Sequence, residues 1–391
     1  MNSYDRTYRI GISGSYGGLN LGDEAILEAI VAQLRQSLSV EITVFSRNAE
    51  HTLRNQDVDR TVPVRDLSRD EARAEVARLD LFVLGGGGIL FDKEVDIYLR
   101  EVQLANELGI PVMVYAISAG PLKHASARAL VRETLTKAAV ITVRDRQGRQ
   151  LLEEVGLHRP ILLTADPAFL IDAMPVPEEM LRREGLPEGR RLVGFSVREP
   201  GPAAPDIEVE HYHRLLANAA DFMVDRLQAD VVFVPMERER MDLQHSHAVV
   251  SQMQCAHHAT ILKGSYRPGQ ILGLVKQFEF VVGMRLHFLL FAARQGVPFV
   301  ALPYASKVSG LIQDLDMEMP PLEDVNTGRL LATIDRSWDM RHRLRQKIQE
   351  RVPMLQQRAR ENNRYLVELL TQGQANKEEG RRDIHADAAQ A

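Results

Sequence analysis

Short apolar runs alternate with amphipathic stretches along most of this 391-residue chain, and this alternation restricts its fold more than any other feature. In the first half, helical patterns separate most of the apolar runs, which is the order expected of βαβ units in a parallel sheet. The predicted strands cover residues 8–13, 41–46, 80–84, 111–118, 140–144 and 161–164.

The first predicted helix has acidic residues, Asp23 and Glu24, in its first turn, where the helix dipole favours negative charge. Its apolar residues recur at helical spacing. They are Ala25, Ile26, Ala29, Ile30 and Leu34.

A segment rich in proline and glycine interrupts the alternation at 173–190, and strands are predicted again from 192 onward, with helices between them. The sequence therefore predicts an α/β protein with two Rossmann-like, doubly wound domains facing across a cleft, and a long C-terminal helix. The expected divisions are an N-terminal domain at 1–175, a linker at 176–190, a C-terminal domain at 191–327, a helical segment at 328–371 and a disordered tail at 372–391.

Charge and composition limit the classes of binding partner and the cellular compartment that we expect for this protein. A net charge of -5 and a pI near 6.2 argue against nucleic acid as the main partner, because phosphate binding usually requires a net basic surface. The single cysteine, Cys255, fits a reducing compartment, and no window approaches eighteen consecutive apolar residues. We therefore expect a cytoplasmic protein.

The segment 281–287 ends an apolar run at an arginine and a histidine, Arg285 and His287. If the run is a buried strand followed by a helix, it brings a fixed cation and an imidazole to the carboxyl edge of a sheet, where an anionic small molecule would bind. Phe195-Ser196-Val197-Arg198 repeats this pattern. Two guanidinium groups suit a ligand that carries both a carboxylate and a phosphate. The alternative is that Arg285 pairs with a structural carboxylate and His287 lies in a core.

Two glycine-rich turns follow predicted strands. The turn at 14–24 includes Gly17, Gly18 and Asn20, and its backbone N–H groups suit an anion or sugar hydroxyls. The alternative is that the glycines serve a tight turn and helix packing. The four consecutive glycines at 85–88, which include Gly86, Gly87 and Gly88, suggest close approach of a ligand.

Two further groups of polar residues have both a structural and a functional interpretation. Arg144 and Asp145 favour an ion pair at a helix start, whereas Asp166 stands before a proline at a strand end, which holds its carboxylate on a stiff turn. The histidines at 245, 247, 257 and 258, with Asp242, match no compact zinc spacing, so surface histidines are expected and no metal is implied.

These motifs together resemble the polysaccharide pyruvyl transferase family over about residues 9–314. Phe288 after the histidine and the Ser-Ala-Gly-Pro turn at 118–121 are departures that bear on substrate preference. The motifs are Gly-Asp-Glu-Ala at 22–25, the glycine run at 85–88, Arg-Asp at 144–145, Thr-Ala-Asp-Pro at 164–167, and above all Gly-Met-Arg-Leu-His at 283–287 with Gly-Val-Pro at 296–298.

The resemblance implies a fold like that of the two-domain glycosyltransferases called GT-B, and transfer of pyruvate from phosphoenolpyruvate to a sugar as a cyclic ketal. Phosphoenolpyruvate is then a co-substrate, and no cofactor is needed. Arg285, Leu286 and His287 would form its pocket, with Arg198 as the second anion clamp. The glycine-rich turns, with Gly17, Gly18, Asn20, Gly86, Gly87 and Gly88, would face the acceptor sugar.

Ketal formation also requires an acid and a base. His287 would orient or protonate near the phosphate, and Asp23, Glu24 or Asp166 would accept the hydroxyl proton. The acceptor would be a polysaccharide or its lipid-linked precursor, which implies peripheral contact with the inner face of the membrane. The acceptor sugar, its linkage and the oligomeric state stay open.

Two other functions compete. A nucleotide-sugar glycosyltransferase of GT-B architecture also uses a basic residue near a helix start, but the stretch 296–304 offers no spaced acids to hold a donor ribose. A non-catalytic sugar-binding or anion-binding protein could keep the glycines and arginines but would have no need of His287.

Overall fold

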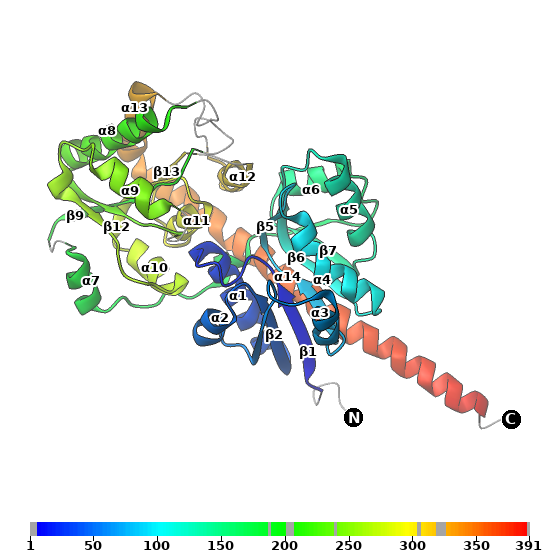
Figure 1. Ribbon diagram of the computed structural model, residues 1–391. Helices are drawn as coiled ribbons and strands as arrows, with labels where there is room; N and C mark the ends of the chain where they lie inside the picture. Colours follow the sequence, from blue (N-terminus) through cyan, green and yellow to red (C-terminus); the bar gives the residue numbers. More distant parts are fainter. Residues whose placement is uncertain are drawn as a thin grey trace. The chain divides into compact units, whose positions relative to one another are not determined.

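A computed structural model describes residues 6–186, 189–200, 207–237, 241–302, 306–317 and 326–388, with side chains to Thr371 except that of Ser306. The chain forms two compact units, each built on a parallel sheet (Figure 1). Unit 1 consists of Met1–Gly17, Ile26–Pro167 and Gln357–Ala391, and unit 2 consists of Gly18–Ala25 and Ala168–Gln356. Two doubly wound α/β units therefore confirm the predicted fold class.

The sheet of unit 1 has the strand order β3-β2-β1-β4-β6-β7-β8, and β5 pairs with β6. All pairs are parallel, and most apolar side chains of the strands are almost fully buried, whereas Leu162 and Leu163 of the edge strand β8 are half-buried. The strands are β1 (Tyr8–Ser13), β2 (Val40–Ser46), β3 (Arg60–Pro63), β4 (Leu81–Leu84), β5 (Gly87–Leu90), β6 (Val112–Ala119), β7 (Val140–Val143) and β8 (Leu162–Leu163).

Side chains at the starts of several helices in unit 1 explain where these helices begin. The Asn48 side chain accepts the N–H of His51, and Ser68 with Glu71 forms a capping box. The helices are α1 (Leu21–Ser37), α2 (Ala49–Asn55), α3 (Arg69–Val76), α4 (Val95–Glu107), α5 (Ala125–Leu135) and α6 (Arg146–Glu154), and the 3₁₀ turn η1 (Pro167–Leu170) follows.

The sheet of unit 2 has the strand order β11-β10-β9-β12-β13, again all parallel. The strands are β9 (Arg191–Ser196), β10 (Ala229–Phe233), β11 (Ala259–Ile261), β12 (Phe278–Gly283) and β13 (Phe299–Ala301). The helices are α7 (Glu178–Glu184), α8 (Val209–Leu227), α9 (Asp242–Val250), η3 (Ala256–His258), α10 (Pro268–Val275), α11 (Leu286–Arg294), α12 (Ser306–Asp314), α13 (Thr327–Asp339) and α14 (Arg341–Ala388).

Each sheet has one point where the order of its strands reverses. In unit 1 the chain moves from β1 to β2 and β3 on one side and then to β4 on the other side of β1. In unit 2 it moves from β9 to β10 and β11 and then to β12 on the other side of β9. Ligands of doubly wound sheets bind outside the carboxyl ends of the strands at such points.

The last part of α14 packs on unit 1 through Asn362, whose side chain is fully buried. Its carbonyl oxygen accepts the hydroxyls of Thr142 at 2.6 Å and Thr164 at 2.8 Å, and its amide donates to the carbonyl of Ala165 at 3.1 Å. The helix continues to Ala388, past residue 372, where the sequence predicts a disordered tail. Side chains from 372 and residues 389–391 lie outside the described part, so the tail stays a prediction.

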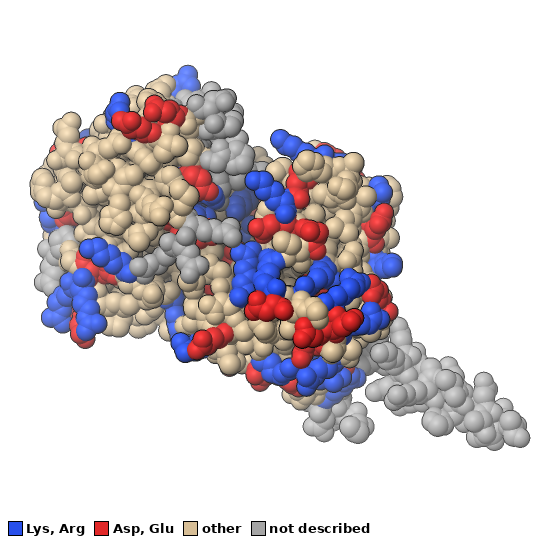
Figure 2. Space-filling model, viewed as in Figure 1, with Lys and Arg blue, Asp and Glu red and all other residues tan. Residues whose placement is uncertain are grey.

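Basic and acidic side chains lie side by side over the visible face of unit 1, on the right in Figure 2. Local ion pairs account for part of this mixture: Glu107, for example, binds both Arg69 and Arg73, the latter at 2.6 Å. On this face, basic and acidic side chains therefore compensate one another within short distances where such pairs form.

Candidate functional site

The strongest candidate site lies at the carboxyl ends of β9 and β12 in unit 2. Gly283 pairs with Ser196, and the N–H of Met284 donates to the carbonyl of Ser196 at 3.1 Å. Because the two strands are parallel and end together, Arg198 and Arg285 reach the same edge of the sheet. This is the carboxyl edge of a sheet that the sequence pattern predicts, and the strand order of the sheet reverses there.

Arg285 is held by two carboxylates. Its Nε donates to Asp242 Oδ2 at 2.9 Å, a second guanidinium nitrogen contacts Oδ1, and the same nitrogen lies 2.9 Å from Glu237 Oε2. Asp242 is fully buried and also accepts the N–H groups of Met236 and Glu237, each at 3.1 Å. This is the structural pairing that the sequence left as an alternative for Arg285, and it fixes the orientation of the guanidinium plane.

His287 lies in the first turn of α11 and is 8% exposed. A Cβ atom built on Gly22 would stand 1.8 Å from His287 Nδ1, so the imidazole packs directly against the backbone of Gly22. The N–H of Leu21 donates to the carbonyl of Met236 at 2.9 Å, and Asn20 forms a β-bridge with Glu237. These contacts explain why Gly18–Ala25 groups with unit 2.

Three of the predicted site residues belong to the same short segment as Gly22. Asp23 and Glu24 directly follow Gly22, and Glu24 is 3% exposed. The Asn20 side chain accepts the N–H of Gly22 at 2.9 Å, so it also holds the turn in shape. Any acceptor contact of Asn20 stays a prediction.

A buried cluster beside the two arginines was not found from the sequence. The hydroxyl of Tyr212 donates to the carbonyl of Arg198 at 2.6 Å and contacts the sulfur of Met284, and Nε2 of His213 lies 2.7 Å from Nδ1 of His245. Burial, His213 and the positive charges of Arg198 and Arg285 lower the pKa of His245 to about 4, so its ring is neutral near pH 7.

His245 is 5% exposed, so its prediction as a surface histidine was wrong. The sequence pattern around His245 could not predict its burial, because its partner His213 lies 32 residues away on another helix. His245 Nε2 and Ser196 Oγ are both buried, and neither has a hydrogen-bond partner among the described residues. Such atoms are rare in native proteins, because burial of a polar atom without a hydrogen-bond partner costs free energy.

Asp166 belongs to unit 1, where Arg144 binds it. The distance from an Arg144 guanidinium nitrogen to Asp166 Oδ2 is 2.5 Å, and both side chains are buried. Asp145 instead accepts the N–H of Gly148 at 2.6 Å and begins α6, while its oxygen stands 4.0 Å from Arg144. The main partner of Arg144 is thus Asp166 rather than the neighbouring Asp145.

At several positions of the two turns, neighbouring atoms or the backbone conformation explain why the residue is glycine. Gly17 has φ +73°, and a Cβ there would lie 2.3 Å from Ser46 Oγ; a Cβ on Gly86 would lie 2.9 Å from Ile26. Gly87 has φ +118°, a backbone conformation that favours glycine, whereas Gly88 is exposed in β5. Gly18 is half-buried in unit 2. Acceptor binding by Gly17, Gly18, Gly86, Gly87 and Gly88 stays a prediction.

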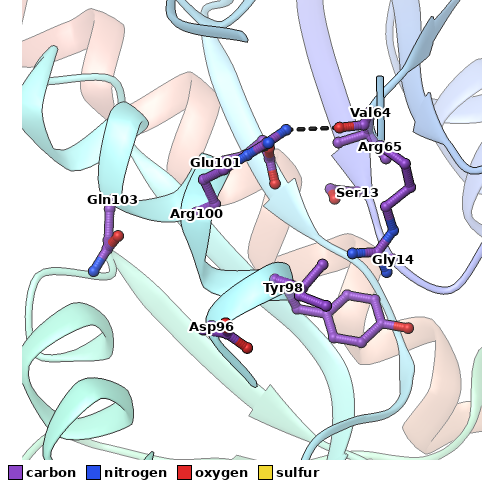
Figure 3. A pocket seen from close by; sticks show the side chains of 10 residues that line it. Ser13, Gly14, Val64, Arg65, Asp96, Tyr98, Arg100, Glu101 and Gln103 are labelled. Carbon is purple, nitrogen blue, oxygen red and sulfur yellow. Dashed lines mark hydrogen bonds and ion pairs between the residues drawn. The ribbon is translucent and has the colours of Figure 1, made fainter. Parts of the chain in front are cut away.

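Unit 1 also contains a pocket of about 300 Å³ (Figure 3). It opens beside the carboxyl end of β1, at Ser13 and Gly14, where the strand order of this sheet reverses. Arg65, which follows β3, and the side chains of α4, among them Arg100 and Glu101, complete its wall.

The described residues contain neither a metal-binding cluster nor a helix that could span a membrane. No group of three histidine, cysteine or acidic side chains there is arranged to hold a metal ion. Nor does any helix in this part of the chain combine the length and the apolar character needed to cross a bilayer.

The fold is similar to those of several solved structures. A putative UDP-N-acetylglucosamine 2-epimerase from Listeria monocytogenes has 11% identity and a TM-score of 0.62, over 95% of this chain and 98% of that one. The UDP-GlcNAc 2-epimerase from Neisseria meningitidis bound to UDP-GlcNAc has 10% identity and a TM-score of 0.61, over 94% of this chain and 100% of that one. A glycosyltransferase from Rickettsia africae has 10% identity and a TM-score of 0.61, over 94% of this chain and 99% of that one.

At these identities the structural likeness establishes the fold alone, which is of the GT-B type. A search of curated proteins found no match to this chain. The family model described as polysaccharide pyruvyl transferase matches residues 20–306, a range that includes the ends of β9 and β12 and the Gly22–His287 contact. The chain therefore belongs to the polysaccharide pyruvyl transferase family.

Proposed function

We propose that the protein transfers the pyruvyl group of phosphoenolpyruvate to two hydroxyls of one sugar in a cell-surface polysaccharide or its lipid-linked precursor. The product is a cyclic ketal, and phosphate leaves. The observation that carries this proposal is the common edge of β9 and β12, which bears Arg198, Arg285 and, in the first turn of α11, His287. Membership of the family supports the transferase class.

The donor would lie at this edge. Arg198 and Arg285 would bind its carboxylate and phosphate, because guanidinium groups match both in geometry and charge. Helix α11 begins at Leu286, and the side chain of its N-cap residue, Arg285, does not cap the helix. The positive end of the helix dipole at this N-terminus would favour a phosphate. Asp242 and Glu237 would keep Arg285 in position before the donor arrives.

The reaction balances as follows. A proton is added to the methylene carbon of phosphoenolpyruvate, which becomes the methyl group, and a sugar hydroxyl forms a C–O bond at the neighbouring carbon. The C–O bond to phosphate breaks, and the second hydroxyl forms the other ketal bond. Of the two hydroxyl protons released, one balances the proton gained by carbon and the other leaves with phosphate or to solvent.

His287 would protonate or orient the donor near its phosphate, as general acid–base catalysis requires. For the base, Asp23 and Glu24 have better support than Asp166, because the Gly22 contact places their segment against His287. Asp166 is already bound by Arg144. Peripheral contact with the inner face of the membrane is part of the proposal if the acceptor is lipid-linked.

A nucleotide-sugar glycosyltransferase is a second candidate, favoured by the fold shared with sugar-nucleotide enzymes. A non-catalytic sugar-binding or anion-binding protein is a third. The test is incubation of the full chain with a panel of nitrophenyl or lipid-linked sugars and either phosphoenolpyruvate or a nucleotide sugar, with release of phosphate or of the nucleotide measured. Release that depends on the sugar supports pyruvyl transfer. Binding without turnover supports a binding protein, and turnover of a nucleotide sugar instead supports the glycosyltransferase.

Variants sharpen this assay. His287→Ala should abolish sugar-dependent phosphate release and leave the thermal unfolding transition nearly unchanged. The matched control is His211→Ala, because His211 is exposed on α8 of the same unit. Full activity in His287→Ala would remove the assigned role of this residue.

A further inference from the structure

The pocket of unit 1 is a second candidate binding site, separate from the anion site of unit 2. Its volume of about 300 Å³ lies at the lower end of the range for small-molecule sites, which suits a single ring better than a dinucleotide. It adjoins the reversal point between β1 and β4, where doubly wound sheets bind their ligands.

One wall of the pocket is rigid and charged. Arg100 donates to the carbonyl of Val64 at 2.7 Å and to that of Leu67 at 3.1 Å, and its Nε donates to Glu101 Oε1 at 2.6 Å. Glu101 is 1% exposed, and burial raises the pKa of its carboxyl. These bonds fix both side chains before any ligand binds, which lowers the entropic cost of binding.

The other wall is formed by Arg65 and Tyr98 (Figure 3). The Arg65 guanidinium lies 5.4 Å from the centre of the Tyr98 ring, and the ring is held from elsewhere by Arg47, whose guanidinium donates to the Tyr98 hydroxyl. Within the described part of the chain, Arg65 makes no hydrogen bond or ion pair. Its fork of N–H donors is therefore positioned by the ring and available to a ligand.

The chemistry of the lining selects the ligand. Carboxylates, such as those of Glu101 and Asp96, only accept hydrogen bonds, whereas guanidinium groups only donate them. Hydroxyl groups do both, so a molecule with several hydroxyls can satisfy both kinds of wall. The Arg65 fork adds a preference for a carboxylate, which it can bind through two parallel hydrogen bonds.

We propose that this pocket binds an acidic sugar unit, a uronate, of the acceptor glycan. Arg65 binds the sugar carboxylate, and Ser13, Asp96 and Glu101 contact its hydroxyls. The assignment of the ligand to the acceptor rests on the proposed function; the preference for an acidic sugar rests on the pocket alone. Specificity for the acceptor is then set in unit 1 by residues that do not touch phosphoenolpyruvate.

The test uses the full chain and two probes, methyl β-D-glucuronide and the neutral methyl β-D-glucoside, with binding measured by ligand-observed NMR titration. The glucuronide should bind about tenfold more tightly than the glucoside. Arg65→Gln should lower the glucuronide affinity about tenfold and change the glucoside affinity by less than about twofold. Arg54→Gln is the control, because Arg54 is an exposed arginine of the same unit that lies outside the pocket.

Equal affinity for the two probes, equal effects of Arg65→Gln and Arg54→Gln, or no saturable binding of the glucuronide at about 10 mM would each overturn the proposal. Asp96→Asn provides a second variant at an exposed position, and it should weaken both probes. No phosphoenolpyruvate is present in this experiment. A failure here therefore leaves the transfer assay untouched, and a failed transfer assay leaves the pocket's sugar binding standing.

Discussion

The imidazole of His287 lies so close to Gly22 that a single added carbon on the glycine would stand 1.8 Å from Nδ1. The two residues are far apart in the sequence, yet the contact joins the start of α1 to the start of α11 within unit 2. It also explains why the residue before Asp23 and Glu24 has no side chain.

Gly22→Ala should therefore displace either the imidazole or the first turn of α1. We expect a loss of about 1–3 kcal/mol in the free energy of unfolding, as for overpacking of a core, together with a large loss of phosphate release. Chemical denaturation and the transfer assay measure the two effects. Gly328→Ala in α13 is the control, since the nearest atom to its added carbon is at an ordinary 3.6 Å. Wild-type stability and activity in Gly22→Ala would contradict the contact.

Asp242→Asn removes the charge that Arg285 binds in a buried site. Because a buried guanidinium then loses the fully buried one of its two carboxylate partners and keeps only Glu237, the free energy of unfolding should fall by about 3 kcal/mol. Denaturant unfolding would measure it. The comparison is Asp335→Asn, which breaks an exposed pair with Arg226 and should cost at most about 1 kcal/mol. Similar costs for the two variants would mean that Asp242 does not hold Arg285.

His245 makes the stability of the protein depend on pH. Its pKa is lowered to about 4 in the folded protein, while that of an unfolded histidine is about 6.5, so the unfolded chain binds more protons between these values. Stability should be constant above about pH 6.5 and fall as the pH is lowered toward 4, by about 2 kcal/mol at pH 5. Unfolding at pH 8 and pH 5 tests this.

His245→Gln should reduce that pH dependence without removing it, because burial also lowers the pKa of His213. A variant that keeps the full slope would show that other groups cause it. His342→Gln, a substitution of a histidine on α14, serves as the comparison and should leave the slope unchanged.

Asn362→Ala should destabilise unit 1. The substitution leaves the buried hydroxyls of Thr142 and Thr164 without their shared acceptor, at a cost of about 2–4 kcal/mol. Thermal unfolding followed by fluorescence or calorimetry measures the loss. Gln346→Ala, on an exposed part of the same helix, should be nearly neutral. An unchanged melting temperature in Asn362→Ala would show that this part of α14 contributes little to the unit.

The strands and the ends of β9 and β12 could be predicted because each depends on local pattern. An apolar run that stops at Arg198 or Arg285 is readable in a few residues, and parallel strands bring such ends together. Strands β3 and β5 were not predicted, because neither has a clear local pattern. Arg60–Pro63 is short and not strongly apolar, and β5 begins inside the glycine run.

The partners of the site residues could not be predicted. Asp242 contacts Arg285 from 43 residues away, and Gly22, near the N-terminus, contacts His287 in the C-terminal half. Neither pair can therefore be recognised from a local sequence pattern. Asp242 and His245 drew attention only as an unlikely metal cluster, whereas the first holds an arginine and the second a histidine. Only the tertiary fold distinguishes these roles.

The most direct test of the account follows the donor carbon itself. Incubation of the full chain with phosphoenolpyruvate and an accepted sugar in D₂O, analysed by NMR and mass spectrometry, should give a cyclic ketal whose methyl group carries one deuterium, with an equal amount of phosphate. That product should be absent with His287→Ala and present with His211→Ala. A product that keeps the methylene group, a sugar that is never modified, or ketal formation undiminished in His287→Ala would contradict the account.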